Sequence, residues 1–138
     1  YQHTEKLIPL MTVNALDNLP LPVYGDGSNK RNWLYVADHC SAVDMIIHHG
    51  KNGEIYNIGG REDMSNIDTV KLILSILGKD NSLIRFTADR KGHDRRYCID
   101  SSKIRNELGW KQTVAFDDGI RQTVDWYKEN RKWWSNSI

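Results

Sequence analysis

Basic and polar side chains are concentrated in residues 89–96, which read DRKGHDRR. An arginine guanidinium binds phosphate through paired, directed hydrogen bonds, and Gly92 permits a tight backbone turn between such groups. His93 adds a further donor, so the segment suits a diphosphate. The composition alone, however, favours a solvated charged loop in which Asp89 and Asp94 pair with the arginines.

Three other segments carry side chains that could contact a ligand. Pro22 and Tyr24 place a rigid ring beside an aromatic one, a pair that can hold a planar base, although an edge strand with a half-buried tyrosine looks the same. Arg31 precedes a run of strand-forming residues and could be a surface charge. Asn57 interrupts apolar residues, where its amide could serve a ligand or the backbone.

We predict no metal site and no catalytic residue in this chain. His48 and His49 are adjacent, so on a helix they do not share a face. Cys40 and Cys98 form no CxxC pattern, which favours two free thiols in a reducing compartment. No GxGxxG turn follows a predicted strand, and no nucleophile has an evident base beside it.

Length and charge limit the classes of protein that remain. The 138 residues are 39% hydrophobic, enough for one globular unit spanning residues 1–138. With 19 Lys and Arg against 18 Asp and Glu, no global field draws nucleic acid, and no apolar run approaches membrane-spanning length. We therefore expect a cytoplasmic protein without nucleic-acid or membrane partners. The first residue is Tyr1, which suggests a fragment.

Strands and helices are predicted to alternate, which indicates the α/β class. Apolar spacing predicts a helix after Thr4, a candidate cap, and another after Asp38. A third helix should start at the capping box formed by Ser65 and Asp68. Two more are expected, one after Asp100 or Ser101 and one around residues 120–127. Gly50, Gly78 and Gly109 should end three of them. Strands are expected at residues 19–24, 33–36, 54–58 and 83–86.

The order and spacing of these segments closely resemble the dTDP-glucose 4,6-dehydratases of the extended short-chain dehydrogenase/reductase family. The matching runs are EKLIP at 5–9, LPVYGDG at 21–27, RNWLYV at 31–36, YNIGG at 56–60, DRKGHDRRY at 89–97 and LGW at 108–110. The pair Lys6 and Leu7, together with the segment 89–96, points to the dehydratases rather than to sister epimerases and decarboxylases.

The resemblance implies the C-terminal, substrate-binding part of an NAD-dependent lyase that converts dTDP-glucose to the 4-keto-6-deoxy sugar nucleotide with loss of water. It also implies that NAD and the catalytic residues belong to an N-terminal Rossmann half that precedes this chain, so that the fragment alone is inactive. The intact enzyme is expected to form a homodimer through that half. The pathway would be rhamnose or deoxysugar biosynthesis.

The resemblance assigns substrate contacts to eight residues. The nucleotide end would be held by Lys6 and Leu7 with help from Asn57, the thymine and deoxyribose by Pro22 and Tyr24, and the diphosphate by Arg31, Arg90 and His93. Three positions depart from the family pattern: Lys91 and Thr4 stand where proline is frequent, and Asn32 where aspartate is common.

Two alternatives remain open at this point. The chain could be the C-terminal part of a UDP-sugar epimerase or decarboxylase, because the individual motifs recur in those enzymes. It could also be a nucleotide-binding module without catalytic activity.

Overall fold

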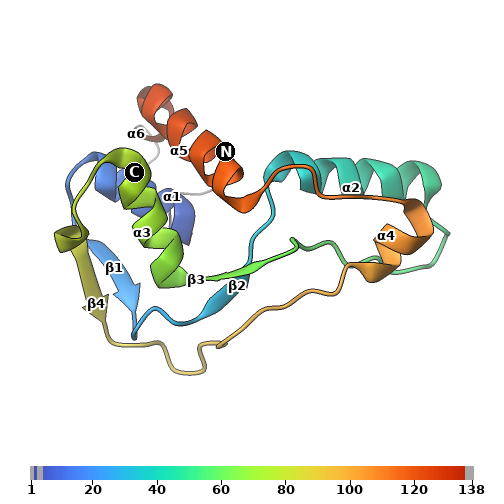
Figure 1. The fold of residues 1–138 in the computed structure, drawn as a ribbon, viewed down its shortest axis with the longest axis horizontal. Helices are drawn as coiled ribbons and strands as arrows, with labels where there is room; N and C mark the ends of the chain where they lie inside the picture. The colour runs from blue at the N-terminus through green and yellow to red at the C-terminus, as the bar shows by residue number, and fades with distance from the viewer. Residues whose placement is uncertain (1, 3–4, 136–138) are drawn as a thin grey trace.

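The structure, a computed structural model, describes residue 2 and residues 5–135. Strands and helices are interleaved along these residues, as the α/β class requires (Figure 1). The helices are α1 (Leu7–Leu16), α2 (Val36–His49), α3 (Asn66–Leu77), α4 (Ser102–Leu108), α5 (Phe116–Glu129) and α6 (Arg131–Ser135), with a 3-10 turn at Asn81–Leu83. The strands are β1 (Leu21–Tyr24), β2 (Lys30–Asn32), β3 (Asp63–Ser65) and β4 (Ile84–Thr87).

The main core lies between helices α1, α3 and α5 and the parallel pair β1–β4. Along β1, Leu21 and Val23 are buried in this core, whereas Pro22 and Tyr24 lie on the opposite face of the strand. Tyr24 is opposite Thr87 in the register, so the end of β1 and the end of β4 coincide. The residues that follow both strands therefore start from the same edge.

The second two-stranded sheet pairs β2 with β3 in antiparallel fashion, with Arg31 opposite Met64. Lys30 also forms a parallel bridge with Arg96, far along the chain. The segment that follows β4 consequently runs back beside β2 (Figure 1).

A smaller apolar cluster holds α2 and α4 at the other end of the molecule (Figure 1). Ala42, Ile104 and Trp110 form its buried centre. The Asp38 carboxylate connects this end to the segment before α5, because it accepts hydrogen bonds from Thr113 and Val114. No helix among the described residues is both long and apolar enough to cross a membrane.

Several predicted helix ends are confirmed. Ser65 caps α3 and forms the reciprocal contact with Asp68, and Gly78 ends that helix in the left-handed conformation. Gly109 ends α4 in the same way. Thr4 lies outside the described residues, and the N-cap position of α1 is Lys6. The helix α6 was not predicted; Trp134 buries its ring there.

Two predicted strands and one predicted cap are wrong. Residues 33–35 form no strand and Val36 already begins α2, because the ladder with β3 engages the preceding polar residues Lys30–Asn32. Residues 54–58 have no ladder partner among the described residues, and Ile55 is 79% exposed. Asp38 lies inside the first turn of α2 and is not its N-cap. Its carboxylate instead accepts a hydrogen bond from Thr113 N.

Candidate functional site

The predicted ligand loop, residues 89–97, is fixed against β2 by backbone hydrogen bonds. Lys30 N donates to Arg95 O at 2.8 Å, and Tyr97 N donates to Lys30 O at 3.1 Å. The buried Asn29 donates its side-chain amide to Asp94 O at 3.2 Å. The loop is therefore positioned by a strand some sixty residues earlier in the sequence.

The tip of the 89–97 loop is a β-turn centred on Lys91 and Gly92. His93 N donates to Arg90 O at 3.1 Å, and Gly92 has φ +70°. A positive φ at the third residue is the requirement of a type II turn and explains the glycine. The turn places Arg90 and His93 side by side at its two ends.

Arg90 stacks on the aromatic ring that ends β1. Its guanidinium carbon lies 5.1 Å from the centroid of the Tyr24 ring, and Tyr24 is 44% exposed. No hydrogen bond joins the Arg90 guanidinium to any of the described residues; Arg90 is bonded through its main chain, whose N donates to Asp89 and whose O accepts from His93 N. The guanidinium donors of Arg90 are thus available to an anionic ligand, and Pro22 lies on the same face of β1 as the Tyr24 ring.

Arg31 is held from three sides. Its Nη1 donates to the carbonyl oxygens of Lys30 and Asp94, at 2.7 and 3.0 Å. Its guanidinium carbon lies 4.5 Å from the centroid of the Tyr97 ring. Its Nη2 lies 2.9 Å from His93 Nε2. The guanidinium plane is therefore fixed before any ligand arrives.

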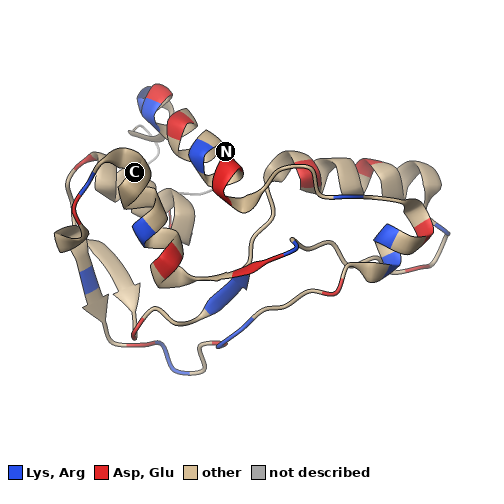
Figure 2. Ribbon diagram, viewed as in Figure 1, with Lys and Arg blue, Asp and Glu red and all other residues tan. Residues whose placement is uncertain are grey.

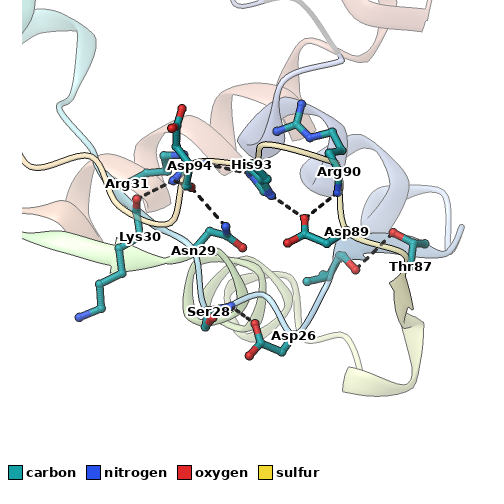
Figure 3. Close-up of polar contacts among 11 residues, drawn as sticks. Asp26, Ser28, Asn29, Lys30, Arg31, Thr87, Asp89, Arg90, His93 and Asp94 are labelled. Carbon is teal, nitrogen blue, oxygen red and sulfur yellow. Dashed lines mark hydrogen bonds and ion pairs between the residues drawn. The ribbon is translucent and has the colours of Figure 1, made fainter.

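His93 lies between Arg31 and Asp89, with only 5% of its side chain exposed (Figure 3). The Nδ1 atom is 2.7 Å from Asp89 Oδ1. The hydrogen bond from His93 lowers the pKa of Asp89, against a smaller rise from desolvation. Asp89 also approaches Gly25 so closely that a Cβ there would lie 3.2 Å from its Oδ2, which ties the turn after β1 to the loop.

The structure corrects the interpretation in which Asp89 and Asp94 neutralise the arginines of the loop. Asp89 pairs with His93, and the Asp94 carboxylate accepts from the Tyr97 hydroxyl. That hydrogen bond raises the pKa of Tyr97, while Arg31 and Arg90 lower it by a smaller amount. Arg96 pairs with Asp63 of β3. Lysine and arginine residues lie along β2 and along the 89–97 loop (Figure 2).

Four of the eight predicted contacts, Tyr24, Arg31, Arg90 and His93, come together here, with Pro22 on the adjoining face. Lys6 and Leu7 lie apart at the start of α1, where Lys6 pairs with Glu5 and Leu7 packs toward the core. Asn57 is exposed and makes no contact with this group among the described residues. Their roles as ligand contacts remain predictions.

Two contributors were not among the predicted ligand contacts. Tyr97 stacks on Arg31, and Asp89 orients His93. Asp89 could have been suspected from its spacing of four residues from His93, whereas Tyr97 carried no signal except its place at the end of the basic run.

Asn32 donates to the carbonyl oxygens of Gly60 and Glu62, which an aspartate could not do.

A groove between α1, α5 and residues 33–36 offers a different kind of surface. It is lined largely by apolar and amide side chains, with no lysine or arginine among its described lining residues, and Asp125 and Glu129 also line it. Its described lining residues therefore offer no guanidinium or ammonium group, the donors that bind phosphate most strongly. The 89–97 loop with β1 and β2 is therefore the better anion site.

The described residues do not form a dinucleotide site. The glycine-containing turn after β1, at Gly25 and Gly27, leads into β2 and not into a helix, and the first amides of α3 beside it already donate to the carbonyl oxygens of Gly27 and Asn29. The helix α3 follows β3 directly, at Ser65, without a glycine-rich turn.

Comparison with known proteins identifies relatives over nearly the whole chain. The family model described as GDP-mannose 4,6 dehydratase matches residues 1–123. A dTDP-glucose 4,6-dehydratase of Streptomyces niveus is 48% identical over 134 residues, 97% of this chain and 40% of the relative. The chain thus spans about two fifths of the length of that relative.

Solved structures agree with this relationship. The crystal structure of a dTDP-glucose 4,6-dehydratase from Bacillus anthracis in complex with NAD has a TM-score of 0.94 and 48% identity, covering 99% of this chain and 43% of that one. A UDP-glucose 4-epimerase from Thermotoga maritima with UDP-glucose has a TM-score of 0.86 and 27% identity, covering 91% of this chain and 40% of that one.

Proposed function

We propose that this chain, which belongs to the GDP-mannose 4,6-dehydratase family, is the sugar-nucleotide-binding portion of a dTDP-glucose 4,6-dehydratase. The observation that carries the proposal is the pair of guanidinium groups of Arg31, on β2, and Arg90, on the 89–97 loop, which lie beside His93 and Tyr24. One is fixed by hydrogen bonds and the other is stacked on Tyr24 with its donors free. Two such groups suit the two phosphates of a nucleoside diphosphate.

The aromatic ring and the proline on the outer face of β1 complete the site. Tyr24 and Pro22 form an apolar wall beside the cations, which suits a base and its deoxyribose. Lys6, Leu7 and Asn57 would approach the nucleotide from α1 and from the segment after α2. The sugar would then extend from the phosphates toward the part of the enzyme outside this chain.

The redox step of the proposed enzyme lies outside the chain. In the proposed reaction NAD takes hydride from the sugar and returns it after water is lost, which requires the Rossmann half. The homodimer contact would belong to the same half. The residues of this chain would bind and orient the nucleotide and would not exchange hydride.

The proposal is tested by titrating the chain with dTDP in a calorimeter. Replacing Arg90 by Ala removes charge-assisted hydrogen bonds to phosphate, so we expect binding weaker by about 1.5–3 kcal/mol, or roughly 10- to 150-fold. Arg121→Ala removes the same charge from an exposed site on α5 and should leave the affinity unchanged. Equal affinity of the two variants would contradict the assignment of Arg90.

The nature of the base separates the dehydratase from the epimerase alternative. The identity of 48% to dTDP-glucose 4,6-dehydratases, against 27% to a UDP-glucose 4-epimerase, favours dTDP. We expect dTDP to bind more tightly than UDP in the same titration. A preference for UDP would favour the epimerase.

A further inference from the structure

The chain turns after α2, and residues 54–58 run back toward β3 as a single unpaired segment (Figure 1). This segment contains no turn or bend. Its side chains alternate in exposure as those of a strand do: Ile55 and Asn57 are exposed, whereas Tyr56 and Ile58 pack against the apolar cluster of α2 and α4. The segment therefore has the pattern of a strand without a neighbouring strand in the described chain.

Only one edge of this segment is occupied. The carbonyl oxygens of Ile55 and Gly59 accept side-chain hydrogen bonds from residues 101–103, at 3.0 and 3.2 Å. Main-chain groups of alternate residues point to the same edge of a strand, so those of Tyr56 and Ile58 point to the opposite edge. No described residue forms a hydrogen bond with the main-chain N or O of either residue. Such an open edge is a template for another strand.

The helix α2 carries a second feature without a partner in the described chain. Four exposed residues form an apolar stripe along it, here called the α2 stripe: Val36, Cys40, Val43 and Ile47. At 3.6 residues per turn they fall within an arc of about 60°. The stripe lies on a different face from Ala42, which is buried in the cluster with α4. A surface helix needs one apolar face, so a second apolar face indicates a second packing partner.

We propose that the α2 stripe and the open edge of residues 54–58 form one docking surface for a β-sheet. The edge strand of that sheet pairs with residues 54–58, and the α2 stripe covers its face. A helix is about 10 Å wide and strands are about 4.8 Å apart, so α2 can cover a second strand beside residues 54–58. Because a helix that leads into a strand is the crossover of parallel sheets, the added strand should run parallel.

The lengths of the relatives indicate where the sheet comes from. This chain covers 40% of the Streptomyces niveus relative, so about three fifths of that relative has no counterpart here. We assign the sheet to this unmatched part. The assignment uses the family relationship and does not depend on the binding of a nucleotide.

The test compares the chain alone with a fusion in which it replaces the matched part of the Streptomyces niveus enzyme. Hydrogen–deuterium exchange, read by mass spectrometry with fragmentation, follows single amides. We expect the amides of Tyr56 and Ile58 to exchange at least about tenfold more slowly in the fusion than in the chain alone. The amide of Asn57 points to the occupied edge and should change less, which makes it the internal control.

Two neighbouring substitutions test the α2 stripe. Ile47→Lys places a charge in the stripe, and His48→Lys places the same charge about 100° around the helix. Both side chains are exposed in the chain alone, so both variants should keep its Tm. In the fusion, Ile47→Lys should lower the Tm by several degrees and speed exchange at Tyr56 and Ile58, because a charge would be buried against the sheet. His48→Lys should do neither.

Each contrary outcome overturns the inference. Fast exchange at Tyr56 and Ile58 in the fusion does so, and so does a fusion without a cooperative unfolding transition. Protection that is already present in the chain alone also overturns it, and a dimer in sedimentation would then identify a second copy as the occupant. Equal effects of Ile47→Lys and His48→Lys in the fusion would exclude packing of the sheet on the stripe. No dTDP is used, so the proposed function is untouched by these results.

Discussion

The Asp38 carboxylate fixes the start of α2 to the segment that leads into α5. It is 2% exposed and accepts three hydrogen bonds: from Thr113 N at 3.0 Å, from Thr113 Oγ1 at 2.6 Å and from Val114 N at 3.0 Å. In Asp38→Asn the retained oxygen can still serve Thr113, but the new amide would face the Val114 N–H, donor against donor. One charge-assisted bond is lost and one N–H is left without an acceptor.

The expected cost is about 2–3 kcal/mol in the free energy of unfolding at neutral pH. For a chain of this size that corresponds to a fall in Tm of the order of 10 °C. Urea denaturation followed by tryptophan fluorescence measures the free energy directly. Asp44→Asn, on the exposed side of the same helix, should change stability by less than about 0.5 kcal/mol.

The pH dependence provides an independent check on the cause. Desolvation raises the pKa of Asp38, but the hydrogen bonds from Thr113 and Val114 outweigh it and lower the pKa below 3.8. A group with a lowered pKa in the folded state stabilises the fold above its unfolded value and loses that contribution as pH falls through the folded value. The difference between wild type and Asp38→Asn should therefore shrink below about pH 4. A constant difference down to acid pH, or none at neutral pH, would refute the reasoning.

Two further variants test local features of the fold by urea denaturation. Ser65→Ala removes the cap that accepts from Asp68 N at 3.1 Å and should lower the free energy of unfolding by about 1 kcal/mol. Ser75→Ala, on the exposed side of α3, should lower it by less. Equal losses in the two variants would argue against the cap. Lys91→Pro places proline at the second position of a type II turn, directly before Gly92. We expect it to be more stable than Lys91→Ala by about 0.4–1 kcal/mol in the free energy of unfolding. Destabilisation would count against that turn type.

Helix boundaries were predictable from the sequence where their cause is local. Each of these features acts within one turn of a helix end. The capping box at Ser65 and Asp68 starts α3, and the left-handed glycines Gly78 and Gly109 end α3 and α4. A short window of residues contains all the partners of such a feature. Asp38 was misjudged because its hydrogen-bond partners, at Thr113 and Val114, are 75 and 76 residues away.

Strands were less predictable because pairing depends on distant segments. Residues 33–36 have strong strand propensity, yet the ladder with β3 formed at Lys30–Asn32, whose residues are polar. Residues 54–58 have the composition of a strand but find no partner in the described chain. Propensity indicated which segments could be extended, and it could not indicate which would be paired.

In the candidate site, too, the sequence indicated which residues take part and not which of them contact each other. The sequence singled out Tyr24, Arg31, Arg90 and His93, all of which meet in the structure. It could not indicate that Arg31 donates to a histidine 62 residues away. The expected ion pairs with Asp89 and Asp94 were replaced by contacts that need the folded loop.

The central claim is that the 89–97 loop with the ends of β1 and β2 binds a nucleoside diphosphate. The most direct test is to titrate the nitrogen-15-labelled chain with dTDP and record amide chemical-shift changes residue by residue. We expect the largest changes at residues 22–31 and 89–97, including the side-chain signals of Arg31 and Arg90. Changes confined to the groove around Trp33, Phe116 and Ile120, or no saturable change at all, would contradict the claim.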